Sequence, residues 1–202
     1  MARLTREESQ GRTRELLIDA ARQAFARSGF GGASVGDIAE AAGFSKGAFY
    51  SNFESKEAIL LELLRRHRQR VVEDLRSMVD GGTPQSILAS LGSWLATRNR
   101  DPDWALLAVE LQLHAARCPS FATEYQAVYR EHRTAIGGLI AMLFHKAGKK
   151  PPADLEDLAA GCMALAQGLN VLQRADQAGQ LVTLFLESLL ATATPARRAA
   201  KK

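Results

Sequence analysis

Glu110 and His114 are the polar side chains best placed to do chemistry in this sequence, because the surrounding stretch is almost wholly apolar. A carboxylate and an imidazole can exchange protons with a substrate, or can hydrogen-bond a small bound molecule. A buried carboxylate needs a partner or a proton, so Glu110 could also be satisfied from within the protein. The candidate internal partners are Arg98, Arg117, Gln167 and Asn170. A ligand role and a structural role are therefore both open, and a histidine such as His114 more often belongs to a core or an interface.

Aromatic side chains accompany these two groups, and together they permit a mostly apolar pocket with few polar anchors. Any one of them alone is more commonly a core residue. We expect a cavity for a small, largely apolar molecule, bounded by the fifth to eighth helices of the chain. The residues expected to line it are Trp94, Trp104, Leu107, Glu110, Leu111, His114, Tyr125, Tyr129, Met163, Gln167 and Asn170.

Other chemistries find little support. His114 and Cys118 are four residues apart, but Pro119 weakens the helix there and no further ligand has metal-site spacing. The sequence has no P-loop, no dinucleotide-binding glycine pattern and no Ser-His-acid order. We therefore predict no catalytic residue, no metal and no cofactor, and keep a small all-α enzyme built on Glu110 and His114 only as an alternative.

The stretch from residue 34 to residue 56 organises the rest of the chain. Ser34 can cap a short helix, Gly43 can end it, and Ser45 can cap a second short helix. Phe49 would lock the second helix against the first. Two short helices joined by a glycine-containing turn are typical of a helix-turn-helix.

The second of these short helices has the features of a recognition helix, whose first residues reach base edges in the major groove. That position belongs to Ser45, Lys46 and Gly47. Lys46 can donate to guanine O6 or N7, while the small residues Gly47 and Ala48 let the backbone come close to the DNA.

The run DIAEAAGFSKGAFYSNFESKEAIL resembles the DNA-binding signature of TetR-type transcriptional regulators. The matching features are the turn 41–43 (Ala-Ala-Gly), then Tyr50 and Phe53, then Lys56 opening a long fourth helix. The resemblance covers about residues 10 to 65. Many relatives have threonine in place of Ala48, so one hydroxyl contact is missing here. The resemblance implies phosphate contacts by Ser34, Tyr50 and Lys56.

The resemblance also implies a mode of action. A homodimeric repressor would bind a palindromic operator in double-stranded DNA, and a small effector would release it by shifting the two DNA-binding heads through the fourth helix. Such release requires only that the effector prefer the state that cannot bind DNA. A DNA-binding factor of the same fold without an effector is the alternative.

Helical spacing of apolar residues predicts an all-α fold of about nine helices. We expect a helix-turn-helix DNA-binding domain over residues 1–56. The remainder, 57–202, would bind the effector, dimerise and end in a basic tail. Residues 1–10 have the composition of a polar arm, with the first helix running from Arg12 to Ser28. The arginine cluster at 65–70 could face phosphates or form ion pairs with Glu62 and Glu73.

The last two predicted helices, 154–175 and 180–193 with Gly179 between them, are too apolar for one chain to cover on every side. Pairing them about a two-fold axis would bury the surplus in an isologous four-helix interface. The residues expected in that homodimer interface are Cys162, Leu165, Leu169, Leu181, Leu184, Phe185 and Leu189.

The bulk properties exclude few functions. The net charge of +4 equals that of the tail (Arg197, Arg198, Lys201 and Lys202), so the rest is balanced and any affinity for nucleic acid must come from local placement. Two cysteines suit a reducing compartment. We see no secretory signal and no apolar run long enough to span a bilayer, and we expect a cytoplasmic protein without a membrane partner.

Overall fold

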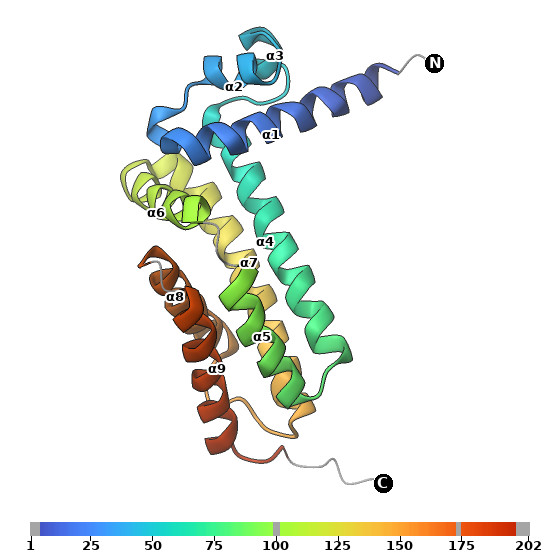
Figure 1. Cartoon of the computed structure of the whole chain (residues 1–202), viewed down its shortest axis with the longest axis vertical. Helices are drawn as coiled ribbons and strands as arrows, with labels where there is room; N and C mark the ends of the chain where they lie inside the picture. The colour runs from blue at the N-terminus through green and yellow to red at the C-terminus, as the bar shows by residue number, and fades with distance from the viewer. Residues whose placement is uncertain (1–4, 99–101, 173–174, 197–202) are drawn as a thin grey trace. The chain divides into compact units, whose positions relative to one another are not determined.

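The computed structural model describes residues 5–98, 102–172 and 175–196, and within these residues the fold is all-α, as predicted (Figure 1). The only β-type pairing among them is a single bridge between Lys149 and Pro195. The helices are α1 (Arg6–Gly32), α2 (Val35–Ala41), α3 (Lys46–Tyr50), α4 (Lys56–Gly81), α5 (Pro84–Arg98), α6 (Pro102–Arg117), α7 (Pro119–Lys146), α8 (Leu155–Val171) and α9 (Ala175–Thr192).

The chain forms two compact units, each with its own hydrophobic core. The first contains the chain up to His67 together with Asp103–Val128, and the second contains Arg68–Pro102 and the chain from Tyr129 onward. The residues of α4 and α7 are divided between the two units. The helix α6 therefore belongs to the same compact unit as the helix-turn-helix. The predicted domain boundary after residue 56 would instead assign α6 to the effector-binding domain.

The first helix begins earlier than its sequence pattern predicts. Thr5 and Glu8 form a reciprocal capping box, in which the Thr5 hydroxyl accepts from the Glu8 amide and the Glu8 carboxylate accepts from the Thr5 amide. These hydrogen bonds also lower the pKa of Glu8. Residues 6–10 are therefore helical, which corrects the expected polar arm; Arg3 of that arm lies outside the described residues.

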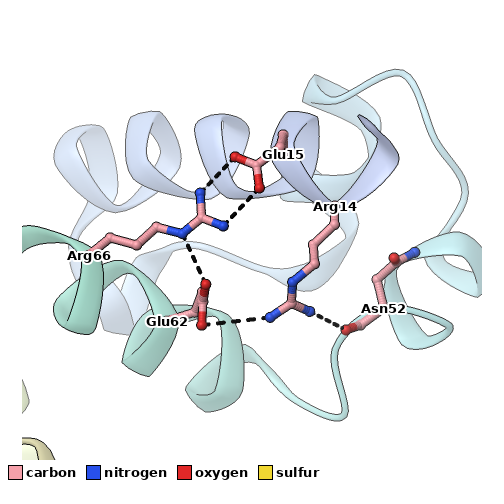
Figure 2. A network of polar contacts seen from close by, with 5 residues as sticks. All are labelled: Arg14, Glu15, Asn52, Glu62 and Arg66. Atoms are coloured by element: carbon pink, nitrogen blue, oxygen red, sulfur yellow. Dashed lines mark hydrogen bonds and ion pairs between the residues drawn. The ribbon is translucent and has the colours of Figure 1, made fainter. Parts of the chain in front are cut away.

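A network of ion pairs joins α1 to α4 (Figure 2). Arg66 makes two hydrogen bonds to Glu15, of 2.6 and 2.7 Å, and a third to Glu62 of 2.9 Å. Arg14 lies 3.7 Å from Glu62 and donates to the Asn52 carbonyl at 2.8 Å. Arg66 lowers the pKa of Glu15. The ion-pair interpretation therefore holds for Arg66, and the network fixes the crossing of α1 and α4 beside the turn that follows α3.

Gly179 lies inside α9, where its lack of a side chain allows α5 to approach. A Cβ atom there would overlap the carbonyl oxygen of Gly92 in α5. The expectation that Gly179 separates the last two helices is wrong, because α8 ends at Val171 and α9 begins at Ala175. The helices α5 and α9 thus cross with their backbones in contact at Gly92 and Gly179.

Candidate nucleic-acid interface

The turn between α2 and α3 has the hydrogen bonds of a Schellman motif. Gly43 adopts a positive φ of 77°, its amide donates to the Glu40 carbonyl at 2.9 Å, and the Phe44 amide donates to the Ala39 carbonyl at 2.8 Å. Ser45 then caps α3, because its hydroxyl accepts from the Ala48 amide at 3.2 Å. The predicted helix-turn-helix is therefore present, and its two helices contact each other (Figure 1).

Phe49 orients α3. Its ring is fully buried, 5.8 Å from the ring of Phe53, so the opposite face of α3 must face outward. Ser45, Lys46 and Gly47 at the start of α3 are exposed, and Tyr50 is 57% exposed. The predicted base-reading residues and Tyr50 are thus accessible to a partner, and the Tyr50 ring makes an edge contact with the ring of Phe49.

The side chain of Lys46 lies over the start of α2, which the amino-acid sequence did not indicate. A Cβ atom on Gly36 would stand 2.8 Å from Lys46 Cε and 3.3 Å from Lys46 Nζ, so the glycine makes room for the lysine. The ammonium group also lies near Asp37, whose pKa is lowered first by hydrogen bonds from Ser34 and further by the charge of Lys46. A long side chain in this position can swing to a nearby base or phosphate.

The other two predicted phosphate contacts already have partners within the protein. The Ser34 hydroxyl accepts from the Asp37 amide at 3.1 Å and donates to its carboxylate at 2.7 Å, and the Ser34 amide completes a capping box by donating to the same carboxylate at 3.1 Å. Lys56 Nζ donates to the carbonyls of Phe30 and Ala33 at 2.7 and 2.9 Å. One of the three N–H groups of Lys56 is left over for an anion.

Glu110 and His114 lie in the first unit, beside the same part of α1. The Glu110 carboxylate accepts a 2.5 Å hydrogen bond from the Phe30 amide, so an internal partner does satisfy it. That partner is a backbone group, which side-chain reasoning had missed. The His114 ring lies 4.8 Å from the rings of both Phe30 and Phe121, with Nε2 3.6 Å from Glu57.

The structure divides the predicted effector pocket between the two units. Leu107, Leu111 and Tyr125 are core residues of the first unit, at 4%, 1% and 8% exposure. Trp104 packs against that core, with its ring 4.3 Å from the ring of His67. The members in the second unit are Trp94, Tyr129, Met163, Gln167 and Asn170.

The predicted pocket residues of the second unit differ in their contacts: some have polar partners within the protein, and a buried oxygen of one has none among the described residues. Trp94 donates to Asp74 at 3.1 Å, and the Arg68 guanidinium lies 5.0 Å from the Tyr129 ring. The buried Asn170 Oδ1 has no hydrogen-bond partner among the described residues. The side chain of Arg98, an expected partner of Glu110, lies outside the part of the chain that the structure describes.

A hollow of about 1080 Å³ also opens beside the α5–α9 crossing, and it was not foreseen. It is a broad groove whose lining mixes apolar residues, such as Leu88 and Leu190, with polar and charged ones, such as Thr183 and Glu187. No described group of three histidine, cysteine or acidic side chains could hold a metal. None of the described helices is long and apolar enough to cross a membrane.

The predicted interface residues of the last two helices differ in their exposure. Leu181, Leu184 and Phe185 are 40%, 56% and 36% exposed on α9. Cys162 is 8% exposed in the core of its own unit, and this burial raises the pKa of its thiol to about 11. Leu165, Leu169 and Leu189 are half-buried. An apolar face therefore lies on α9, and Cys162 does not belong to it.

A helix-turn-helix with an accessible second helix defines a DNA-binding regulator of the all-α class. The profile of the bacterial regulatory proteins of the tetR family matches residues 17–63. The profile of the BetI-type transcriptional repressor C-terminal region matches residues 84–191, more than half of the chain. The chain belongs to the TetR family of bacterial transcriptional regulators, a class of DNA-binding proteins and not of enzymes.

Individual relatives agree with this assignment. The transcriptional repressor AcnR of Corynebacterium efficiens is 29% identical over 122 residues, which are 59% of this chain and 61% of AcnR. This chain therefore spans less than two thirds of that relative. A putative regulator from Pseudomonas aeruginosa PAO1 has the same fold, with a TM-score of 0.72, 24% identity and 94% of both chains covered. A regulator from Saccharomonospora viridis in complex with choline has a TM-score of 0.68 and 24% identity, over 88% of this chain and 96% of that one.

Proposed function

We propose that this protein is a cytoplasmic, homodimeric transcriptional repressor that binds a palindromic operator in double-stranded DNA and is released by a small, largely apolar effector. The observation that carries the proposal is the exposed start of α3, held in place by the fully buried Phe49. Two such helices related by a two-fold axis would read two half-sites about one DNA turn apart, roughly 34–36 Å.

In this proposal Lys46 reads a base in each half-site, next to Ser45, Gly47 and Ala48. Tyr50, which is exposed, contacts a phosphate. Ser34 and Lys56 contact phosphates only with the hydrogen-bonding capacity that their internal partners leave free. Lys46 should therefore carry sequence preference, while the phosphate contacts carry affinity for any sequence.

Lys46→Ala tests the reading surface. The probe is the DNA fragment that the wild-type protein selects from a random-sequence library. We expect a loss of about 1–3 kcal/mol in binding and a relaxed preference at one position of each half-site, because a base contact disappears. Lys150→Ala removes the same charge from an exposed site in the second unit and should bind like the parent. Equal binding and equal preference by both variants in a salt titration would exclude Lys46 as the reader.

The effector is proposed to bind in the second unit, near Trp94, Tyr129, Met163 and Gln167, with Asn170 as its polar anchor. Support comes from the buried, unpartnered Asn170 Oδ1 among the described residues and from the match to BetI-type repressors. The structural neighbour from Saccharomonospora viridis is in complex with choline, which supports including a cationic head group in the search.

A thermal-shift screen tests this site. Choline and a broad set of lipophilic compounds are added to the full-length protein. A ligand at 100 times its Kd should stabilise the folded state by about 2.7 kcal/mol, because it binds only that state. Asn170→Ala removes the acceptor and should reduce the shift for any compound that donates a hydrogen bond. No shift across the whole set, with DNA binding intact, would favour a DNA-binding factor without an effector.

A further inference from the structure

We propose that Glu110 is a positioning residue for DNA binding, which holds the joint between α1 and α2 through the main chain of Gly29 and Phe30. The proposal rests on the DNA-binding function proposed above. Glu110 lies on α6, far along the chain from the helix-turn-helix, yet its carboxylate accepts a hydrogen bond from the Phe30 amide at 2.5 Å. The two residues belong to the same compact unit.

The backbone at Gly29 is shaped to receive this carboxylate. Gly29 has a φ of 67°, which breaks the regular course of α1, and the amide that follows it donates to Glu110. A Cβ atom on Gly29 would stand 2.5 and 2.8 Å from the two carboxylate oxygens. Glycine is thus required here both for its conformation and for the close approach of Glu110.

Lys56 holds the same segment by its carbonyls. Its ammonium group donates to Phe30 and Ala33, and it also lies 4.3 Å from the centre of the Phe30 ring. The main chain of Phe30 is thus bound on both sides: its N–H donates to Glu110 of α6, and its carbonyl accepts from Lys56, the first residue of α4. Ala33 directly precedes Ser34, the N-cap of α2, so these contacts fix the point from which the helix-turn-helix begins.

The hydrogen bond between Glu110 and Phe30 also links the two parts of the chain that match the two family profiles. Phe30 lies within the part of the chain matched by the tetR-family profile, and Glu110 within the part matched by the BetI-type C-terminal profile. A displacement of α6 therefore acts on the start of α2 through a charged hydrogen bond, which is stronger than one between neutral groups. Glu110 thus has the structural role of the two that the sequence left open, and it supports the helix-turn-helix instead of contacting a ligand.

The test compares DNA affinity with folding in Glu110→Ala, Glu110→Gln and a control, Glu124→Ala, which removes an exposed carboxylate from α7 in the same unit. The probe is the fragment selected by the wild-type protein. We expect roughly tenfold weaker binding for the alanine variant, measured well below its melting temperature, and a smaller loss for glutamine, whose amide oxygen can still accept. The control should bind like the parent.

Two further measurements separate positioning from simple stability. Hydrogen exchange in the free Glu110→Ala protein should speed up at Phe30 and along α2, with α9 unchanged. The effects of Gly29→Ala and Glu110→Ala on affinity should be non-additive in the double variant, because both break one contact. Unchanged affinity in Glu110→Ala, or a loss that parallels faster exchange over the whole chain, would overturn the proposal. If the wild-type protein selects no DNA at all, the proposed function fails first, and the two failures are thereby distinguished.

Discussion

Leu184→Asp should convert the protein into monomers and weaken operator binding by at least about 100-fold, because each monomer then engages only one half-site. Leu184 is 56% exposed on α9, beside Leu181 and Phe185. An apolar face of this kind on the terminal helices is the natural contact for a second copy, which would bury it about a two-fold axis. A carboxylate placed in that contact would be desolvated without a partner. Sedimentation equilibrium and a DNA titration measure the two effects.

Leu106→Asp is the matched control, since Leu106 has almost the same exposure, 55%, but lies on α6 in the first unit. It should leave the dimer intact. Gly168→Leu in α8 gives an independent probe, because a Cβ atom added there meets nothing within 4 Å in its own chain. It should weaken the dimer only if α8 joins the interface. A wild-type protein that sediments as a monomer at micromolar concentration would contradict both the interface and the model of two half-sites.

The helix-turn-helix could be predicted closely because its signals are local. Ser34 and Ser45 act as caps, Gly43 takes the left-handed conformation of a Schellman turn, and Phe49 is buried, all as their positions in the sequence indicate. The two caps and the turn depend only on hydrogen bonds to close neighbours in the sequence, while the burial of Phe49 follows from its place on the inner side of α3. Such a motif can therefore be predicted from a single sequence without knowledge of the rest of the fold.

The contacts of Glu110 and Lys56 could not be predicted in the same way. Glu110 meets a backbone amide 80 residues away, and Lys56 meets carbonyls 23 and 26 residues away. Backbone groups leave no trace in side-chain patterns, so only the three-dimensional structure shows where they are free. The glycine at position 29 was a visible signal, but it indicated the end of a helix and not the place where α6 arrives.

The start of α1 was missed for a different reason. Residues 6–10 are polar on every side, so they lack the apolar stripe by which a helix is usually recognised. The reciprocal hydrogen bonds of Thr5 and Glu8 are the signal that marks this terminus. Threonine followed three residues later by glutamate is the standard sequence form of that capping box.

Gly179 was misread because glycine has two opposite uses in helical proteins. It often ends a helix, but it also lets two helices approach until their backbones touch, and spacing along one chain does not distinguish these uses. The partner, Gly92, lies in a helix distant in sequence. Only the pairing of α5 with α9 reveals that both glycines serve a single crossing.

Gly179→Ala should therefore destabilise the second unit by about 1–3 kcal/mol, even though alanine is the better helix former. The added methyl group would overlap the Gly92 carbonyl oxygen and would lie 3.4 Å from the Ala96 amide nitrogen, and neither backbone group can rotate away. Gly138→Ala in α7 is the control: its Cβ meets nothing within 4 Å, so the free energy of unfolding should rise by up to about 1 kcal/mol. Urea unfolding followed by circular dichroism, at one protein concentration for both variants, gives the comparison. A Gly179→Ala protein as stable as Gly138→Ala would mean that α5 and α9 do not cross at backbone distance.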